Sequence, residues 1–480
     1  MAHPLSQRIE DVLALDPHGA ALQFDDAWHT WGQIAALARR IGGIGGTGTV
    51  GVMLRNEPAH VAALLGVLAA GGTVVVINPS RGDDRTRSDI AALHLPVLVG
   101  LAADLEALAP ATGATTVAIS DLDTAPVVRE GAGDAADRPG VAVWMLTSGT
   151  TGPPKRVDLT YDMLARSVIG ADLETAAPPA AVRAGVAIMN SPLVHVGGVF
   201  RVLLCVAEAR RFVLLRRFDL DQWAAAVREH RPRAVSLVPA ALRMVLHSDL
   251  TREDLAGVRA VTCGTAPLSA DDADAFTAKF GVPVLTSYAA TEFGGGVAGW
   301  TLADHQAFWA TKRGSVGRAN PGTQLRVVDE SGRTLGPDRA GLLEVKPAQL
   351  GPAAEWIRTT DLARLDADGF LWILGRADQA IIRGGFKVLP DDVRAALESH
   401  PAVAGAAVIG TPDARLGETP VALVEIRDGA TTDADTLTDY LGSRLARYEV
   451  PTRIVIVDAV PRTPSGKPDL AAVRSLLAPP

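Results

Sequence analysis

The feature that most limits what this chain can fold into is an apolar run that passes directly into Ser, Thr and Gly. Val141–Met145 is apolar, and residues 147–152 read TSGTTG, ahead of two prolines and Lys155. An apolar run that ends in such a turn is typical of a buried strand. Gly and short hydroxyl residues let backbone N–H groups close around an anion, and Lys155 adds a positive charge. The stretch therefore predicts an anion-binding loop after a buried strand rather than a plain surface turn.

Two common glycine motifs do not describe this chain. The phosphate loop G-x-x-x-x-G-K-[ST] requires Gly where Pro154 stands, and Lys155 is followed by Arg156. Residues Gly43–Gly48 match G-x-G-x-x-G, but they follow a predicted helix and precede a predicted strand. A dinucleotide site needs the opposite order, because the pyrophosphate meets the helix N-terminus. The sequence argues against both sites.

Composition describes a protein built around sizeable hydrophobic cores. The chain has 480 residues, of which 48% are hydrophobic and 21% charged, enough for two or three domains. The net charge of −8 gives no basic footprint, so no nucleic acid partner is expected. The two cysteines form no disulfide framework or metal-ligand spacing, and we expect no signal peptide and no transmembrane segment. These features predict a cytoplasmic location.

Lysine is scarce in this chain. Only six of its 46 Lys and Arg residues are lysines. A chain that so favours Arg retains Lys where a compact ammonium is useful. Lys155, Lys387 and Lys467 are therefore candidates for functional roles.

The hydrophobic pattern predicts an α/β fold in two parts. Helical patterns at Thr30–Arg40 and Pro58–Ala70 alternate with strand patterns at Val50–Leu54 and Thr73–Ile77. Such alternation favours parallel sheets flanked by helices. Further strands are expected at Val186–Met189, Phe212–Leu215, Ala234–Val238, Arg259–Cys263 and Val282–Ser287, followed by a β-rich part from Gln324 to Leu374.

A short motif separates the two predicted parts. Gly375–Asp378 precedes about 100 residues with their own mixed strand and helix pattern. We predict a large N-terminal domain over residues 1–377 and a small, mobile α+β domain over residues 378–480.

Seven further stretches carry polar residues in distinctive combinations. They are Pro192–Gly198 (PLVHVGG), Gly264–Leu268 (GTAPL), Tyr288–Glu292 (YAATE), Thr359–Asp361 (TTD), Gly375–Asp378 (GRAD), Gly384–Lys387 (GGFK) and Pro461–Lys467 (PRTPSGK). Together with residues 147–160, their order and spacing resemble the adenylate-forming superfamily: acyl- and aryl-CoA ligases, luciferase and peptide-synthetase adenylation domains. The resemblance spans nearly the whole chain and is most like a stand-alone acyl-CoA ligase. Local departures are Arg156, Ala289 and Thr360, where Gly is usual, and Tyr161, where His is common.

The resemblance implies an ATP site. Its phosphate loop comprises Thr147, Ser148, Gly149, Thr150, Thr151, Gly152 and Lys155. A turn of Gly264, Thr265 and Ala266 would pass beneath adenine, and the Tyr288 ring would stack on it. Thr291 would contact the α-phosphate and Glu292 would hold Mg²⁺. Asp361 would accept hydrogen bonds from the ribose hydroxyls, and Arg376 would reach the ribose or phosphate.

The resemblance also implies an acid pocket, a hinge and a catalytic lysine. The pocket residues are His195, Gly197, Val199, Gly294 and Gly295, with Gly198, Gly264, Phe293 and Gly296 nearby. Asp378 would be the hinge, Gly384, Gly385 and Lys387 would guide coenzyme A, and Lys467 would join the carboxylate to the α-phosphate.

The implied activity is an AMP-forming carboxylic acid–CoA ligase that uses ATP, Mg²⁺ and coenzyme A. Glycine and the absence of charge at these wall positions favour a fatty or bulky apolar acid, with an aryl acid as the main competitor. Loading of an aryl or fatty acid onto a free carrier protein stays open, and so does a homodimer. A non-catalytic nucleotide-binding relative is the least favoured alternative, because Lys155, Glu292, Asp361, Arg376 and Lys467 are all retained.

Overall fold

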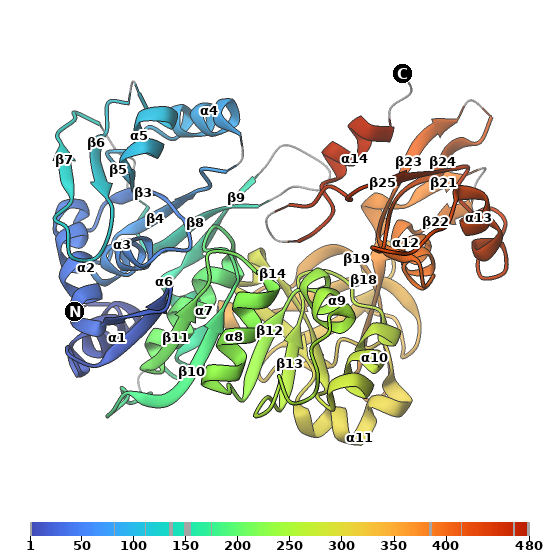
Figure 1. Ribbon diagram of the computed structural model, residues 1–480, viewed down its shortest axis with the longest axis horizontal. Coiled ribbons are helices and arrows are strands. Elements are labelled where there is room, and N and C mark those ends of the chain that lie inside the picture. Colours follow the sequence, from blue (N-terminus) through green and yellow to red (C-terminus); the bar gives the residue numbers. More distant parts are fainter. Residues whose placement is uncertain are drawn as a thin grey trace.

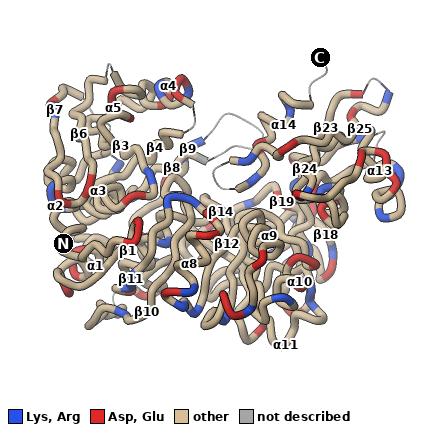
Figure 2. The backbone as a smooth tube through the Cα atoms, in the orientation of Figure 1, with Lys and Arg blue, Asp and Glu red and all other residues tan. Residues whose placement is uncertain are grey.

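The computed structural model describes residues 2–80, 82–110, 112–133, 138–147, 155–173, 175–383, 386–413, 415–463 and 466–477, without the side chains of Thr147 and Lys387. These described residues form five sheets. Four of them build a large body, and the fifth belongs to a smaller C-terminal unit, coloured orange to red in Figure 1. Figure 2 shows Lys and Arg interspersed with Asp and Glu along the described chain.

The first sheet has the strand order β7-β6-β5-β3-β4-β8-β9, with parallel pairing inside and antiparallel pairing at both ends. Helices α1 to α3 contribute to the core on one face, and α4 and α5 pack on the other. Its strands are β3 (Thr49–Met53), β4 (Thr73–Ile77), β5 (Val97–Leu101), β6 (Thr115–Ile119), β7 (Val127–Arg129), β8 (Val141–Thr147) and β9 (Lys155–Thr160); its helices are α1 (Pro4–Leu15), α2 (Trp31–Gly45), α3 (Pro58–Ala69), α4 (Asp83–Leu93) and α5 (Ala102–Leu108). The inner strands β3 and β4 are buried along their whole length, which explains their continuous apolar sequence.

The second sheet, ordered β10-β11-β1-β2, shares one hydrophobic core with the first. Helices α6 and α7 lie in that shared core, so helices are packed between the two sheets (Figure 1). The elements are β1 (Ala20–Phe24), β2 (Ala27–Thr30), β10 (Arg183–Met189), β11 (Arg210–Leu214), α6 (Tyr161–Val168) and α7 (Val196–Ala207).

The third sheet, ordered β12-β13-β14-β15-β16, is parallel in its first three strands and antiparallel beyond. A second core between this sheet and the second one includes α8 to α10. The elements are β12 (Ala234–Leu237), β13 (Ala260–Cys263), β14 (Val284–Ala290), β15 (Gly295–Gly299), β16 (Arg318–Ala319), α8 (Leu220–His230), α9 (Pro239–His247), α10 (Ala270–Phe280), α11 (Leu302–Lys312) and the 3-10 turn η1 (Thr291–Phe293).

The last two sheets are predominantly antiparallel. The fourth consists of β17 (Gln324–Val328), β18 (Ala340–Lys346), β19 (Ile357–Leu365) and β20 (Leu371–Arg376), with η2 (Ala348–Leu350) and η3 (Ala377–Gln379) beside it. The C-terminal unit holds β21 (Ile381–Arg383), β22 (Phe386–Val388), β23 (Val403–Asp413), β24 (Gly417–Ile426), β25 (Arg453–Val457), α12 (Pro390–Glu398), α13 (Ala434–Gly442) and α14 (Leu470–Leu477). Only β25 pairs in parallel there, with β24.

The predicted α/β fold class is confirmed, including the β-rich part and the small unit that follows it. Residues 43–45 end α2 and residues 46–48 connect it to β3, so the glycine motif follows a helix and precedes a strand, as expected for a turn. Among the described residues, the structure contains no helix long and apolar enough to span a membrane. The division between residues 377 and 378 stays a prediction.

One buried asparagine joins the sheets of the body. The Asn56 amide donates to the carbonyls of Ser191 and Leu215, both at 3.0 Å, and its oxygen accepts from Leu193 N–H at 2.8 Å. All three partners lie just beyond β10 or β11, whereas Asn56 follows β3. Asn56 thus satisfies backbone groups that no strand pairs, and it fixes the segment that leads to His195.

Arg156, the unusual residue after Lys155, ties β9 to the helix layer. Its side chain is 8% exposed, and its guanidinium lies 2.5 Å from the Asp89 carboxylate of α4. A second nitrogen donates to the Val76 carbonyl at 3.0 Å. The departure therefore has a structural role that a glycine could not perform.

We predict that Arg156→Met lowers the free energy of unfolding of the large body by about 3 kcal/mol, because it leaves the Asp89 carboxylate without its buried partner. The double variant Arg156→Met/Asp89→Asn is expected to recover part of that loss. Urea unfolding followed by tryptophan fluorescence measures both, and equal stability of the wild type and Arg156→Met would contradict the role.

Candidate functional site

Three predicted nucleotide residues, Tyr288, Asp361 and Arg376, meet on β14, β19 and β20. The Tyr288 hydroxyl of β14 donates a hydrogen bond to the Asp361 carboxylate of β19. Burial raises the pKa of Tyr288, and the neighbouring Asp361 carboxylate raises it further. Burial also raises the pKa of Asp361, whereas the bonds to Tyr288 and the charge of Arg376 oppose that change. The tyrosine stays a neutral donor, and it holds the carboxylate in place.

Arg376, the last residue of β20, is oriented by one residue of β19 and one of the turn η3. Its register partner across β19 and β20 is Asp361. The guanidinium donates to Thr360 Oγ1 at 2.8 Å and makes a two-point contact with Asp378, at 2.9 and 2.6 Å. Thr360, which stands where glycine is usual, therefore supplies an acceptor that fixes this arginine.

Thr291 and Glu292 begin the short 3-10 turn η1, which directly follows β14. The Glu292 side chain is exposed, and no ion pair to it occurs among the described residues. The part of the chain that the structure describes has no group of three or more His, Cys, Asp or Glu that could hold a metal. A single free carboxylate suits Mg²⁺, which keeps several waters and takes its other ligands from substrate phosphates.

Lys467 reaches this cluster from the C-terminal unit. Its loop is closed by bonds from Thr463 N–H to Lys467 O at 2.7 Å and from Gly466 N–H to Thr463 O at 2.8 Å. A Cβ placed on Gly466 would lie 3.3 Å from Val238, the residue that caps α9 in the large body. The loop therefore touches the body directly.

The charges around Lys467 show which residues it faces. Its side chain is exposed to water, but the surrounding protein lowers its pKa, and Arg376 lowers it further. Asp361 and Glu292 act in the opposite direction. One ammonium, one guanidinium and two carboxylates from separate elements thus lie within electrostatic reach of each other.

His195 directly precedes the first residue of α7, and the charge of Lys467 affects its pKa. Burial lowers the pKa of His195 to about 4, and the Lys467 charge contributes to that shift. Its ring nitrogen Nε2 is buried, without a hydrogen-bond partner among the described residues. A neutral imidazole with one free nitrogen is suited to hydrogen-bond a ligand.

The glycines of the predicted acid pocket differ from one another. A Cβ on Gly197 of α7 would meet no atom within 4 Å, so open space lies beside that residue. Gly294 and Gly295 have φ values of +70° and +151°, which side-chain-bearing residues rarely adopt. Gly198 is close-packed, since a Cβ there would lie 2.2 Å from the Pro192 carbonyl oxygen. Of these four glycines, only Gly197 has open space beside it and no conformational or packing reason to be glycine.

Gly294, Gly295 and Gly296 form a segment that we call the glycine wall. Three side chains that the sequence analysis did not single out donate hydrogen bonds to its backbone. Ser167 Oγ donates to Gly294 O at 2.9 Å, while Asn320 Nδ2 and Gln349 Nε2 donate to Gly296 O at 2.9 and 2.8 Å. The Gln349 side-chain oxygen is buried with no partner in the described chain. The sequence could not indicate these three contacts, because the side chains come from separate segments and bind backbone carbonyls, which every residue carries.

The other predicted residues fall into four groups. Gly264 adjoins Ser287, and Thr265 has a φ of +72°, so the turn after β13 lies against β14. Val199 is fully buried in the core between the first two sheets and is not brought to the cluster. Lys155 begins β9 with an exposed side chain. Outside the described residues lie Ser148, Gly149, Thr150, Thr151, Gly152, Gly384 and Gly385, with the side chains of Thr147 and Lys387.

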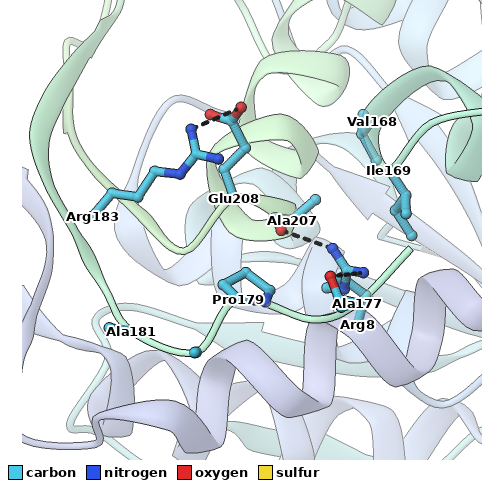
Figure 3. A pocket seen from close by; sticks show the side chains of 10 residues that line it. Arg8, Val168, Ile169, Ala177, Pro179, Ala181, Arg183, Ala207 and Glu208 are labelled. Carbon is cyan, nitrogen blue, oxygen red and sulfur yellow. Dashed lines mark hydrogen bonds and ion pairs between the residues drawn. The ribbon is translucent and has the colours of Figure 1, made fainter. Parts of the chain in front are cut away.

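The charged side chains that line a hollow elsewhere on the body are paired with other described residues. Figure 3 shows Arg8, Arg183 and Glu208 around it. The Arg8 guanidinium donates to the carbonyls of Ala207 at 3.2 Å, Ala176 at 2.8 Å and Ala177 at 3.0 Å. Arg183 pairs with Glu208 at 3.2 Å. These charges are already satisfied, which argues for a structural role.

A buried ion-pair network holds the C-terminal unit against the body. Arg243 of α9 contacts Asp272 of α10 at 2.7 Å and Glu398 of α12 at 2.8 Å. The Arg243 and Glu398 side chains are 9% and 5% exposed. Arg394, also on α12, donates to the same Glu398 carboxylate at 2.7 Å. This contact fixes the orientation in which Lys467 faces Asp361.

Comparison with known proteins gives the same picture along the whole chain. The family model for AMP-binding enzymes matches residues 9–352, and the model for the AMP-binding enzyme C-terminal domain matches residues 392–467. The chain is 29% identical to 4-coumarate–CoA ligase 1 of Oryza sativa subsp. japonica, over 94% of this chain and 86% of the relative. It is also 29% identical to indoleacetate–CoA ligase of Aromatoleum aromaticum, over 99% and 98%.

The two units are arranged much as in a solved structure with ATP bound. ATP-bound MatB from Rhodopseudomonas palustris superimposes with a TM-score of 0.82 at 26% identity, covering 99% of each chain. The apo form of the same protein gives a TM-score of 0.69 at 25% identity, again over 99% of each chain.

We predict that Glu398→Ala loosens the contact between the two units by about 3 kcal/mol, because Arg243 loses its only carboxylate on the C-terminal unit among the described residues. Trypsin cleavage at Arg376 and Arg383 is expected to become several-fold faster, as followed by gel densitometry. Asp391→Ala serves as the control, since that carboxylate contacts Arg394 within α12 alone. Unchanged cleavage in Glu398→Ala would show that other contacts hold the units.

Proposed function

We infer that this chain, which belongs to the family of AMP-binding enzymes, is an ATP-dependent, AMP-forming ligase that joins a bulky, mainly apolar carboxylic acid to coenzyme A. Enzymes of this kind use ATP, Mg²⁺ and coenzyme A. The observation that carries the proposal is the position of Lys467, held by the C-terminal unit within reach of Asp361, Glu292 and Arg376 of the body.

The first step of the proposed reaction joins two anions. The acid's carboxylate attacks the α-phosphorus of ATP, pyrophosphate leaves, and an acyl-adenylate forms. Such a step needs positive charge and hydrogen-bond donors fixed in advance where negative charge develops. Lys467 would lie between the carboxylate and the α-phosphate, with Arg376 beside it. Mg²⁺ at Glu292 would neutralise phosphate oxygens.

The body would hold the nucleotide with residues that the structure has already oriented. One Asp361 oxygen accepts from Tyr288, so the other oxygen is free to accept from the ribose, while the Tyr288 ring would stack on adenine. The turn Gly264–Ala266 would pass beneath the base, and Thr291 would donate to the α-phosphate. Residues 147–152 and Lys155 would surround the outer phosphates.

His195 is suited to contact the acid. At neutral pH its imidazole is uncharged, so it does not compete with Lys467 for the carboxylate, and its free Nε2 can form a hydrogen bond. Gly197, one residue into α7 from Val196, leaves room beside it for the acyl part.

The second step transfers the acyl group to the thiol of coenzyme A, with release of AMP. We propose that the C-terminal unit, residues 378–480, rotates about Asp378 and replaces Lys467 by the loop of Gly384, Gly385 and Lys387. Adenylate is a good leaving group, so positioning of the thiol matters more than acid–base help. The buried Arg243–Glu398 contact would break during this rotation.

The acid is proposed to carry a ring or another bulky apolar group. The open side of Gly197 and the absence of charge on the glycine wall favour this class. Relatives named for 4-coumarate and indoleacetate support aryl acids, so these precede fatty acids in the panel. The cytoplasm, where ATP and coenzyme A are available and Cys205 and Cys263 stay reduced, is the proposed location.

The experiment that tests the function is acid-dependent release of pyrophosphate from ATP over aryl, cyclic and fatty acids, with and without coenzyme A. Turnover that requires coenzyme A would support the ligase, and the preferred acid would name the substrate class. Release that ignores coenzyme A would favour a carrier-protein thiol as the acceptor. No release with any acid would contradict the proposal and favour a non-catalytic relative. Size-exclusion chromatography with light scattering would test the homodimer.

We predict that Lys467→Ala slows formation of the acyl-adenylate by about 10²–10³-fold, because it removes the charge placed between two reacting anions. Transfer from a supplied acyl-adenylate to coenzyme A should change by no more than a few-fold. Single-turnover assays of the two half-reactions measure this difference. The control is Arg462→Ala, which removes a cation that pairs with Glu425 in the same C-terminal unit. Equal losses in both half-reactions would contradict the role of Lys467.

A further inference from the structure

One arginine on the predicted acid-pocket helix has no carboxylate partner among the described residues. Arg201 lies in α7, and its side chain is partly buried. Its guanidinium donates a long hydrogen bond of 3.4 Å to Thr262 Oγ1 of β13. In the described parts of the chain, no Asp or Glu lies within ion-pair distance of it.

Other buried arginines of this chain are fully engaged. Arg8 donates to three backbone carbonyls, Arg156 pairs with Asp89, and Arg243 pairs with two carboxylates. A guanidinium presents five N–H donors in a rigid fork, and one long bond to a hydroxyl leaves most of them unused. The surroundings of Arg201 therefore differ from those of a structural arginine.

The neighbouring titratable group does not compensate the charge. Burial lowers the pKa of Arg201, and the Cys205 thiol, one helical turn along α7, opposes that change. Burial raises the pKa of Cys205 to about 12, so the thiol is neutral at physiological pH. The positive charge of Arg201 consequently lacks a counter-charge, which is costly for a partly buried group.

Arg201 lies on the face of α7 that borders open space. It follows Gly197 by four residues, so the two share one side of the helix. A Cβ on Gly197 would meet nothing within 4 Å. The contact with Thr262 shows that the guanidinium extends from α7 toward β13, the strand that leads into the turn at Gly264.

The spacing along α7 separates Arg201 from the reacting end of the pocket. His195, whose pKa is affected by the charge of Lys467, precedes α7 and lies six residues before Arg201 in the sequence. Six residues of α-helix correspond to roughly 9 Å. An acid whose carboxylate lies near His195 and Lys467 would thus direct its far end toward Arg201.

We propose that Arg201 binds a second anionic group on the acid, so that the substrate is a dicarboxylic acid with a mainly apolar body. The assignment rests on the proposed ligase function and specifies its substrate. The guanidinium fork binds a carboxylate through two parallel hydrogen bonds. A monoacid of the same shape that ends in a methyl group would leave the Arg201 charge unpaired. A site that is built to bind a polar group discriminates against substrate analogues that lack it.

The test compares acids that differ only at the far end. The pairs are 4-carboxybenzoate with 4-methylbenzoate, and octanedioate with octanoate, measured by pyrophosphate release with the full-length enzyme. The wild type is expected to prefer the acid with two carboxylates by at least tenfold in kcat/KM in one pair. Arg201→Gln should lose that preference through a higher KM for the diacid, with activity toward the monoacid unchanged or increased. Arg201→Lys should retain part of it, and Arg217→Gln, at an exposed site, should behave as the wild type.

A binding measurement separates this proposal from the ligase function. Thermal melting of the wild type with a non-hydrolysable ATP analogue should rise with the preferred diacid and not with its monoacid partner, and Arg201→Gln should lose the rise. Efficient activation of monoacids alone, or an unchanged preference in Arg201→Gln, would overturn the second subsite and leave the ligase intact. Absence of pyrophosphate release together with a diacid-dependent rise in melting would overturn the ligase and support the anion site. Absence of both would overturn both.

Discussion

The candidate site depends on one buried contact between the two units, the ion pair of Arg243 and Glu398. The residues that would bind the nucleotide lie on the body, among them Tyr288 on β14, Asp361 on β19 and Arg376 at the end of β20, whereas Lys467 comes from the C-terminal unit. Among the described residues, no sheet includes strands of both units, and the chain near Arg376 is their covalent link. A charge pair that is mostly removed from water is directional, because either partner left alone is strongly penalised. It therefore selects one relative orientation, and that orientation places the ammonium beside Asp361 and Glu292.

The residues that depart from the family pattern are accounted for by local contacts. Arg156 pairs with Asp89 and so links β9, the strand that follows the predicted phosphate loop, to α4. Thr360 accepts a hydrogen bond from Arg376, and the Tyr161 hydroxyl donates to the Gly72 carbonyl at 2.6 Å. Ala289 is exposed opposite Gly296 and meets no steric obstacle there. Each change adds a local interaction or is neutral, and none removes a group that the proposed chemistry needs.

The sequence was sufficient to predict contacts that local geometry controls. The alternation of apolar runs predicted the parallel sheets, and Pro461–Lys467 predicted a turn that projects one lysine. The contact between Arg243 and Glu398 could not be predicted, because it joins residues 155 positions apart on surfaces that are complementary only after folding. Arg201 was also missed, since an arginine in an apolar helix reads as a surface residue until the strand opposite is known. Val199 illustrates how helix geometry separates sequence neighbours: it lies in the core between the first two sheets, whereas Gly197, two residues earlier on α7, borders open space.

The glycine wall at residues 294 and 295 has a consequence for how the range of acids can change, by evolution or by engineering. The positive φ values there mean that the wall is made of backbone, which no side-chain replacement can reshape without distorting the turn after Phe293. The proposed pocket thus has one side whose backbone resists substitution and one side, on α7, where position 197 has open space for added bulk. Changes in the preferred acid are therefore expected to arise more readily at position 197 than at residues 294 and 295.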